Sequence, residues 1–549
     1  MIGLHDQTVR GAKSLDDAAA RHRWNIPADY SVVGDCLLRH QHRADDPCLI
    51  YEDEAGNVQR WSWGGMLAAV NRFANALRAL GVGRGDVVAV YLPQRPENAI
   101  AHFACHRLGA LSLPISKLFA PEAVRYRLQH SEAKVLVVDD ETAELFAAFP
   151  QEIETFKHVV VVGAAGPGQR FDALMERASS DFTLDRPYTS EDPFLLMFTS
   201  GTTGNPKAVI HHARMVAAQN GLDYMFNFFE PDDLYFSSAD WAWVGGLVTG
   251  LIGIWPHGVP VLATSARFDP ERTLAMVERH GATRGLYAPT ALKRLRELPS
   301  PKKMFPNLRL RCIFSGGEAV SPELKRWVRE DLGTEFNMAY GQTEANATVG
   351  TCKALEDFPI EALGKPMPGH RMDIIDADGA VLPPGEVGEI ALRKGDPVLM
   401  ATYFRNEKAF AERFIGDWYL TGDTGWKDDT GYFYFKGRID DVIKTSGYRV
   451  GPGEVEAAII GVEGVASCAV IGVPDERVGE SIKAFVKVMP GQQPTPELTA
   501  RIQAHVRSVL AKHEYPREIE YMDEFPMTVT GKIRRRDLRE MEIAKRAQA

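Results

Sequence analysis

A group of hydroxyl-bearing residues and glycines follows an apolar run that begins at Leu195. The run ends in Thr199-Ser200-Gly201-Thr202-Thr203-Gly204, and Lys207 follows after Asn205 and Pro206. Glycines let backbone N–H groups approach a ligand closely, hydroxyls donate hydrogen bonds, and a lysine adds a point charge. A strand, such a turn and a lysine together are typical of a phosphate-binding loop. The spacing differs from G-x-x-x-x-G-K-[ST], so this loop is not a Walker A motif.

Five further segments place glycines beside polar or aromatic residues. They are 315–319 (SGGEA), 340–344 (YGQTE), 419–423 (YLTGD), 437–449 (GRIDDVIKTSGYR) and 527–535 (MTVTGKIRR). In this order, and together with residues 195–211, they resemble the signature motifs of the adenylate-forming superfamily. The resemblance extends from about Trp61 to Arg536 and is most similar to the short- and medium-chain acyl-CoA synthetase branch.

The resemblance implies an AMP-forming acid–thiol ligase that uses ATP, Mg²⁺ and coenzyme A. In such an enzyme a carboxylate attacks the α-phosphate of ATP and expels pyrophosphate, and the acyl group of the acyl-AMP then passes to coenzyme A. Phosphoryl transfer requires donors and positive charge around the phosphate oxygens, which suits the residue types of these motifs.

The resemblance also assigns a role to each motif in nucleotide binding. The loop residues Thr199, Ser200, Gly201, Thr202, Thr203 and Gly204 and the side chain of Lys207 are expected at the β- and γ-phosphates. Thr343 is expected at the α-phosphate, and Glu344 is expected to ligate Mg²⁺, a hard cation that prefers oxygen ligands. Adenine is expected between the ring of Tyr340 and Gly317, Glu318 and Ala319, with Asp423 and Arg438 at the ribose.

The C-terminal motifs imply a mobile second domain. Residues 1–438 are expected to form the adenylation domain, and residues 439–549 a small domain that swings about a hinge at Asp440. In one position Lys532 would reach the substrate carboxylate and the α-phosphate as a catalytic residue. In the other position Ser446, Gly447, Tyr448 and Arg449 would bind coenzyme A, so that one active site runs two reactions.

The residues that choose the acid are expected beside the motifs. Trp243, Val244, Gly245 and Gly246 are expected to line the acyl pocket together with Gly341. In acetate-specific members of the resembled family a tryptophan closes the pocket at the position matched by Gly341. Glycine at this position predicts an open floor, and no basic residue nearby in sequence would receive a second carboxylate. We therefore expect a monocarboxylic acid longer than acetate, of medium-chain, branched or aryl type.

Three alternative functions stay open at this stage. The chain could load acyl groups onto a carrier protein, although it has no appended carrier domain. It could adenylate an amino acid, with Asp240 pairing to the substrate ammonium, although Asp240 also suits a helix N-cap before the run at Trp241. It could also be a non-catalytic acyl-nucleotide binding protein, although Lys532 and Glu344 are both present.

Hydrophobic periodicity predicts the elements that position these residues. Helical spacing near 66–77 and 98–109 alternates with short apolar segments at 86–92, 110–115 and 134–138, and the alternation returns at 194–333. This pattern predicts two stacked α/β units with parallel sheets. Closely spaced turn signals at 364–437 predict an antiparallel sheet resembling a distorted barrel. The remaining residues predict a small α+β domain.

Composition narrows the partners and the compartment. The chain has 549 residues, too many for one core, and a formal net charge of −10, which argues against a nucleic-acid partner. Six scattered cysteines and a charged N-terminus predict a cytoplasmic protein. The uncharged run at 241–266 contains glycines and Pro256, so we expect a buried helix and strand and no membrane span. A homo-oligomer is left open.

Overall fold

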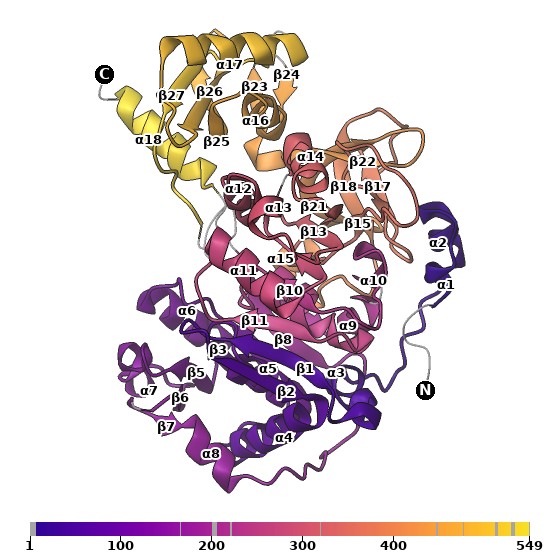
Figure 1. Ribbon diagram of the computed structural model, residues 1–549, viewed down its shortest axis with the longest axis vertical. Coiled ribbons are helices and arrows are strands. Elements are labelled where there is room, and N and C mark those ends of the chain that lie inside the picture. Colours follow the sequence, from indigo (N-terminus) through magenta and orange to yellow (C-terminus); the bar gives the residue numbers. More distant parts are fainter. Residues whose placement is uncertain are drawn as a thin grey trace.

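The computed structural model describes residues 7–164, 166–199, 206–219, 222–318, 320–445, 448–475, 477–510, 514–528 and 533–547. Two large sheets, a smaller antiparallel sheet and a separate C-terminal sheet organise this part of the chain. Figure 1 shows the C-terminal sheet and its helices at the top, above the other three sheets.

The first large sheet contains β8 and β9, the strands that precede and follow the candidate phosphate loop in the sequence. Its described strands pair in the order β19-β9-β8-β4-β3-β5-β6-β7. In chain order they are β3 (Val87–Tyr91), β4 (Leu111–Pro114), β5 (Val135–Asp139), β6 (His158–Val162), β7 (Gln169–Arg170), β8 (Pro193–Thr199), β9 (Lys207–His212) and β19 (Thr402–Tyr403). Strands β3 to β8 pair in parallel, whereas β9 runs antiparallel to both β8 and β19.

The second large sheet contributes the other strand ends at the candidate site. Its described strands pair in the order β16-β15-β14-β13-β12-β10-β11-β1-β2. They are β1 (Pro47–Glu52), β2 (Val58–Ser62), β10 (Tyr235–Ser237), β11 (Val261–Thr264), β12 (Arg284–Leu286), β13 (Cys312–Gly316), β14 (Glu335–Tyr340), β15 (Val349–Gly350) and β16 (Lys365–Pro366). The central strands are parallel, and β2, β15 and β16 are antiparallel additions at the two edges.

Helices join the parallel strands in both units. The longer ones are α4 (Trp63–Ala79), α5 (Pro96–Leu108), α6 (Pro121–Ser131), α11 (Pro270–His280), α12 (Pro289–Arg296) and α14 (Pro322–Glu330). The shorter ones are α1 (Gln7–Arg10), α2 (Leu15–Arg21), α3 (Val32–Cys36), η1 (Leu38–Arg43), η2 (Ala143–Phe146), α7 (Phe149–Glu152), α8 (Phe171–Arg177), α9 (Arg214–Ala218), α10 (Leu222–Met225) and α13 (Pro301–Met304).

Local sequence accounts for this alternation. Strand β3 reads VVAVY with all its side chains buried, as expected for a parallel strand covered on both faces. Helix α4 begins after Ser62, whose hydroxyl accepts a hydrogen bond from the N–H of Gly65. Helix α5 stops at Gly109, which adopts the left-handed conformation with φ +73°. The prediction of two α/β units is therefore confirmed.

The uncharged run at 241–266 forms short buried elements. It contains η4 (Gly245–Ile252), which is a π-helix, then η5 (Trp255–His257) and strand β11. No helix in the described part of the chain is long and apolar enough to cross a membrane. The expected buried helix and strand are present, and the helix is a π-helix of a kind that often occurs at functional sites.

A smaller antiparallel sheet follows the two α/β units. Its strands are β17 (Met372–Ile375), β18 (Gly388–Arg393), β20 (Phe414–Ile415), β21 (Trp418–Lys427) and β22 (Phe433–Arg438), with helix α15 (Glu407–Ala411) beside them. They pair in the order β17-β18-β21-β20, and β22 also pairs with β21. The antiparallel character is as predicted, while the pairings of the described strands form an open sheet.

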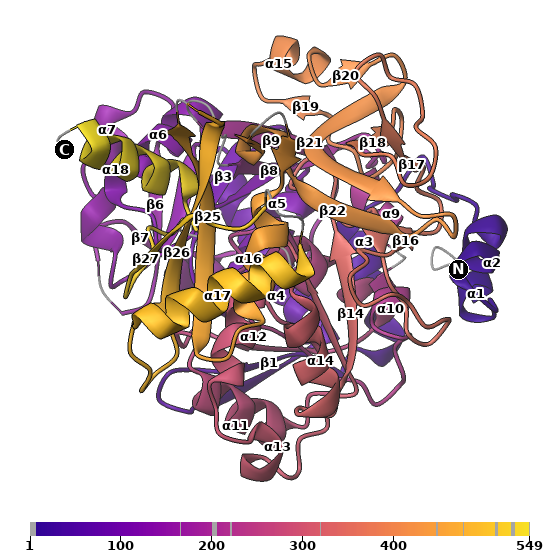
Figure 2. The same ribbon diagram turned by 90° about the horizontal axis from the view of Figure 1, so that it is seen from above.

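The C-terminal sheet is covered on both faces. It contains β23 (Ile443–Thr445), β24 (Tyr448–Val450), β25 (Val465–Asp475), β26 (Gly479–Val488) and β27 (Glu518–Tyr521), with η6 (Ile439–Asp441), α16 (Pro452–Ile460), α17 (Pro496–Val509) and α18 (Arg535–Ala547). Val470 of β25 packs in the cluster with α16 and α17, whereas its neighbours Ala469 and Ile471 pack with Leu538 of α18. Figure 2 shows α17 and α18 with strands β25 and β26.

Candidate active site

Thr199 and Lys207, at the two ends of the candidate phosphate loop, belong to a pair of antiparallel strands. Strands β8 and β9 pair antiparallel, and Thr199 at the end of β8 lies opposite Lys207 at the start of β9. Ser200, Gly201, Thr202, Thr203 and Gly204 lie outside the described residues. This pairing therefore places the hydroxyl of Thr199 and the ammonium of Lys207 at the same end of the sheet.

A buried carboxylate, that of Asp423, joins the second large sheet to the smaller sheet. Its Oδ2 accepts hydrogen bonds from the Tyr340 hydroxyl and from Nε2 of Gln342, both over 2.7 Å. Its Oδ1 lies 3.3 Å from Nη1 of Arg438, the residue opposite Asp423 in the β21–β22 pair. Burial, reinforced by the charge of Asp423, raises the pKa of Tyr340, so its hydroxyl stays a proton donor.

Glu344 is held by a tyrosine from the other large sheet. Its Oε1 accepts a hydrogen bond from the hydroxyl of Tyr403 over 3.0 Å, and its carbonyl accepts one from the N–H of Met400 over 2.8 Å. The ring of Tyr403 also lies beneath the ammonium of Lys207, 5.1 Å from Nζ to the ring centroid. Tyr403 thus links Lys207 to the carboxylate of the YGQTE motif.

The carboxylate of Glu344 fits a magnesium ion whose other ligands would be substrate phosphates and waters. The described residues contain no group of three or more His, Cys, Asp or Glu side chains that could hold a metal on its own. Mg²⁺ usually binds through one or two carboxylates together with substrate phosphates and waters. Within the part of the chain that the structure describes, Tyr403 binds Oε1 of Glu344, and its second carboxylate oxygen can serve this kind of coordination.

The SGGEA motif begins with the last two residues of β13, and Gly317 and Glu318 follow the strand. Gly317 has φ +82°, and a Cβ added there would meet nothing within 4 Å. A Cβ on Gly316, in contrast, would lie 2.4 Å from the carbonyl oxygen of Ala339. Gly316 is therefore required by strand packing, whereas Gly317 leaves open space that a flat ligand could occupy. Ala319 lies outside the described residues.

The two acyl-pocket glycines at 245 and 246 differ in what surrounds them. A Cβ on Gly245 would meet nothing within 4 Å, whereas one on Gly246 would lie 2.0 Å from the carbonyl oxygen of Asp240. Trp243 and Val244 are both half-buried, and the Trp243 ring lies 5.8 Å from the ring of Phe119, between centroids. Open space therefore lies beside Gly245, and Trp243 with its Phe119 contact is two residues earlier in the chain.

The prediction that Gly341 opens the floor of the acyl pocket is wrong for this backbone. A Cβ on Gly341 would lie 2.2 Å from the backbone nitrogen of Ala347 and 3.0 Å from the carbonyl oxygen of Ala345. The turn at 345–347 therefore fills the space that a side chain at position 341 would occupy. Gly341 allows a close approach of two backbone segments, whereas open space lies beside Gly245.

Asp240 is held within the protein. Its Oδ1 accepts a hydrogen bond from the N–H of Ala242 over 3.1 Å, and its Oδ2 accepts one from the hydroxyl of Ser116 over 3.0 Å. Burial raises the pKa of Asp240. Both carboxylate oxygens therefore have partners, and the bond to Ala242 is that of an Asx turn before η4.

The C-terminal motifs lie on the small sheet and its connections. Asp440 is in η6, directly after β22, and Arg449 pairs with Lys444 in the β23–β24 hairpin. Tyr448 of this hairpin is 54% exposed. Ser446 and Gly447, like Lys532, lie outside the described residues.

Comparisons with known proteins agree on one family. The family model described as AMP-binding enzyme matches residues 38–404, and that of its C-terminal domain matches residues 454–532. The acetyl-coenzyme A synthetase of Bacillus subtilis is 36% identical over 509 residues, which cover 91% of this chain and 88% of that protein. The chain belongs to the AMP-binding enzyme family. It is an AMP-forming acid–CoA ligase whose substrates and cofactors are ATP, Mg²⁺, coenzyme A and a carboxylic acid.

Two further relatives of this AMP-binding enzyme are an acyl-coenzyme A synthetase and an anthranilate CoA ligase. Human mitochondrial acyl-coenzyme A synthetase ACSM4 is 33% identical, covering 96% of this chain and 94% of that protein. The structure of the anthranilate CoA ligase AuaEII in complex with anthranoyl-AMP superposes with a TM-score of 0.88 at 27% identity. The superposition covers 95% of this chain and 99% of the AuaEII chain. The predicted fold class, with its small C-terminal domain, is confirmed.

Several residues around the site of this enzyme were missed by sequence reasoning. Tyr403 lies outside every motif, and Phe119 lies far from the Trp243 segment in sequence. His211 received no role from the motifs, yet its Nε2 lies 2.7 Å from the carbonyl oxygen of Thr343. Strand periodicity offered one usable signal for His211. Lys207 and His211 are four residues apart on β9, and side chains at an even spacing lie on the same face of a strand.

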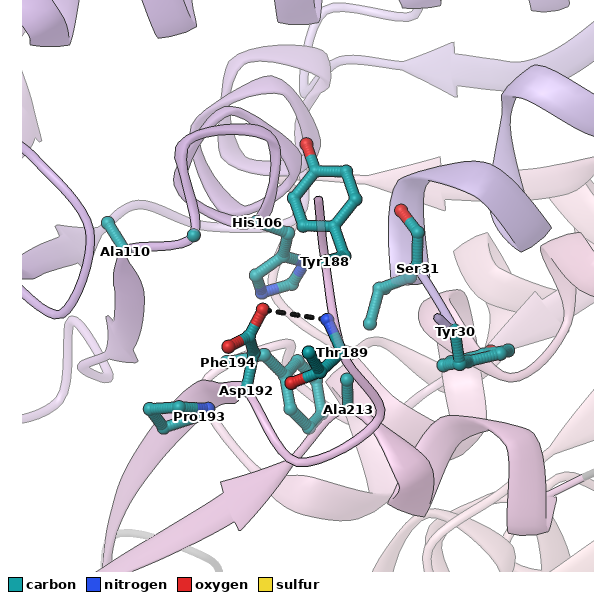
Figure 3. Close-up of a pocket in the computed structure, with 12 residues that line it drawn as sticks. Tyr30, Ser31, His106, Ala110, Tyr188, Thr189, Asp192, Pro193, Phe194 and Ala213 are labelled. Carbon is teal, nitrogen blue, oxygen red and sulfur yellow. Dashed lines mark hydrogen bonds between the residues drawn. The ribbon is translucent and has the colours of Figure 1, made fainter. Parts of the chain in front are cut away.

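His106 of α5 has a structural role. His106 Nε2 contacts the hydroxyl of Ser112 over 3.1 Å, and burial lowers the pKa of His106 to about 3. Figure 3 shows His106 beside a small cavity of about 20 Å³, where the N–H of Thr189 donates to Asp192 over 3.0 Å. A space of this size holds about one water molecule. The cavity therefore belongs to the core and cannot hold an acyl group.

Proposed function

We propose that this acid–CoA ligase acts on a monocarboxylic acid larger than acetate, of medium-chain, branched or aryl type. The observation that carries the proposal is the open space beside Gly245, in the same segment as Trp243, whose ring lies 5.8 Å from that of Phe119 between centroids. A pocket of this composition favours apolar groups with several carbons. The relatives named above include both an acetyl-coenzyme A synthetase and an anthranilate CoA ligase, so their names alone do not choose the acid.

The same proposal gives each described motif a part in nucleotide binding. Lys207 and Thr199 hold the β- and γ-phosphates, supported by their opposition in the β8–β9 pair. Glu344 ligates Mg²⁺, and the backbone and side chain of Thr343 lie at the α-phosphate. Mg²⁺, when bound, neutralises charge that develops on the phosphates.

The nucleoside part of ATP is assigned to residues at the ends of β13 and β14 and on strands β21 and β22. Asp423 accepts the ribose hydroxyls, with Arg438 beside it, and three neighbouring side chains already orient its carboxylate. Adenine lies between Tyr340 and the Gly317–Glu318 segment, where Gly317 offers open space. Ala319 and the loop residues 200–204 complete these assignments by family resemblance.

Two half-reactions follow in this proposal. A carboxylate oxygen of the acid forms a bond to the α-phosphorus of ATP while the bond to pyrophosphate breaks, and Lys532 stabilises the charge on the oxygens. The thiol of coenzyme A, losing its proton, then forms the thioester bond and AMP leaves. Residues 1–438 and 439–549 act as two domains that rotate about Asp440 between the steps. Ser446, Gly447, Tyr448 and Arg449 meet coenzyme A after the rotation.

The location of the protein is part of the same proposal. The six cysteines are all free thiols and all buried. Free thiols persist in the reducing cytoplasm. We therefore propose a cytoplasmic enzyme.

The proposal is tested by measuring pyrophosphate and acyl-CoA together over a panel of acids. Acetate, hexanoate, 2-methylpropanoate and benzoate are supplied singly with ATP, Mg²⁺ and coenzyme A. We expect equal amounts of pyrophosphate and thioester, and a higher kcat/KM for at least one larger acid than for acetate. Pyrophosphate release without thioester would favour loading of a carrier protein. Acetate as the best acid would overturn the proposed substrate class.

A further inference from the structure

His211 connects the two motifs that meet at the phosphates. It lies on β9, the strand that begins at Lys207, and it is fully buried, at 0% exposure. Its Nε2 lies 2.7 Å from the backbone carbonyl oxygen of Thr343. Strand β9 belongs to the first large sheet and the YGQTE segment follows β14 of the second, so this contact joins the two α/β units at the candidate site.

The contact has a defined hydrogen-bond direction. Burial lowers the pKa of His211 to about 4, so the ring is neutral at the pH of the cytoplasm. A carbonyl oxygen can only accept a hydrogen bond, and therefore Nε2 carries the proton and donates it. Nδ1 is buried and has no hydrogen-bond partner among the described residues. The bond to Thr343 is thus the polar contact that orients the ring.

The segment that receives this bond is the one that carries the metal carboxylate. The carbonyl of Thr343 precedes Glu344, whose own carbonyl is held by Met400 and whose side chain is held by Tyr403. Ala401 lies between Met400 and Tyr403 in the chain. Its N–H donates to the carbonyl of Ile210, the residue before His211. The backbone from 343 to 344 is therefore fixed from the β9 side by both a strand contact and the imidazole.

We propose that His211 is a positioning residue for the adenylation step, which holds the Thr343–Glu344 segment against the Lys207 strand through its bond to the Thr343 carbonyl. The inference rests on the roles proposed above for Thr343 and Glu344. Loss of the donor removes this hydrogen bond from the Thr343 carbonyl and lets the segment move. Because Glu344 is the described carboxylate at the metal position, the affinity for Mg²⁺ is the property most directly affected.

The test compares His211→Phe, which keeps a planar ring without a donor, with His211→Gln, which can donate from a similar distance. His212→Phe is the matched control, because His212 is the next residue on β9 and its Nδ1 contacts Glu191 over 3.0 Å instead. Calorimetry measures the affinity for ATP with Mg²⁺ and with EDTA. This measurement needs no acid, so it stands whether or not the proposed acid is correct.

We expect His211→Phe to weaken ATP binding about 10- to 100-fold with Mg²⁺ present and much less in EDTA, as for residues that orient metal ligands. We expect His211→Gln to recover most of this loss and His212→Phe to resemble wild type. Thioester formation from supplied acyl-AMP should change less than pyrophosphate exchange in His211→Phe. An unchanged Mg²⁺-dependent affinity in His211→Phe, or an equal loss with and without Mg²⁺ that glutamine does not recover, would overturn the proposal. If His211→Phe fails to fold, the same comparison is made with His211→Gln and His211→Asn, whose shorter amide falls short of the Thr343 carbonyl.

Discussion

The hydroxyl of Tyr340 donates a hydrogen bond to Asp423 over 2.7 Å, and this bond joins the end of β14 to β21. Tyr340 belongs to the second large sheet, whereas Asp423 and its partner Arg438 belong to the smaller antiparallel sheet. The carboxylate assigned to the ribose is thus oriented by two sheets at once. Substitutions of Tyr340 or Asp423 should therefore weaken nucleotide binding more than they change the preference among acids.

Asp423→Asn should lower kcat/KM for ATP by about 10- to 100-fold. A hydrogen bond to a charged group contributes about 1.5–3 kcal/mol, and the variant removes the charge that both the ribose and Arg438 contact. Steady-state kinetics with ATP varied at saturating acid measures the effect. The control is Tyr434→Phe, which removes another Tyr–Asp bond, to Asp428, over 3.0 Å. Equal losses in the two variants would contradict the assignment.

Tyr403→Phe should raise the Mg²⁺ concentration needed for half-maximal pyrophosphate exchange by about 10-fold, because it frees the side chain of Glu344. The ring that lies beneath Lys207 is kept in this variant, so the affinity for ATP measured in EDTA should stay close to that of wild type. Tyr403→Leu removes the ring as well and should weaken ATP binding in both conditions. A Phe variant with wild-type Mg²⁺ dependence would show that Tyr403 does not orient the metal carboxylate.

Gly341→Ala should lower activity and thermal stability without changing the preference among acids. The added Cβ would lie 2.2 Å from the backbone nitrogen of Ala347, so the YGQTE segment or the turn at 345–347 must shift. The melting temperature and the ratio of kcat/KM values for hexanoate and acetate together test this. A stable variant with an altered ratio would restore Gly341 to the acyl pocket.

Acidification should destabilise the wild type more than His211→Gln. Burial lowers the pKa of His211 from 6.5 in the unfolded chain to about 4, with smaller contributions from His212 and Arg214. Between pH 6.5 and 4 the unfolded chain binds a proton that the folded chain refuses, so the free energy of unfolding falls as the pH falls. From pH 7.5 to 5 we expect the wild type to lose about 2 kcal/mol more than His211→Gln. Denaturant unfolding at both pH values measures the difference, and equal losses would refute the buried neutral imidazole.

Periodicity in the sequence was enough to predict the α/β units, because each buried strand is a short apolar run such as VVAVY in β3. The motifs likewise marked Tyr340, Glu344 and Asp423, whose contacts depend on strand ends that parallel sheets bring to one edge. Such local patterns carry information about which residues come together at the same side of a sheet.

Contacts between distant segments were not predictable in the same way. Whether Gly341 faces open space depends on the turn at 345–347, and whether Gly245 does so depends on how η4 packs. Tyr403 reaches Glu344 only because β19 pairs with β9, far from it in the chain. None of these relationships leaves a periodic trace in the sequence, and only the structure shows that open space lies beside Gly245 and that backbone fills the space at Gly341.

The most direct test of this account is the ratio of kcat/KM for hexanoate or benzoate to that for acetate, measured in wild type and in Gly245→Val. Gly453→Val is the matched control, because Gly453 also lies in a helix and a Cβ there would meet nothing within 4 Å. We predict that the wild type favours a larger acid and that Gly245→Val lowers the ratio by about 10- to 100-fold, as expected when bulk enters an apolar pocket. The control should keep the wild-type ratio. A wild type that prefers acetate, or a ratio that Gly245→Val leaves unchanged, would contradict the account.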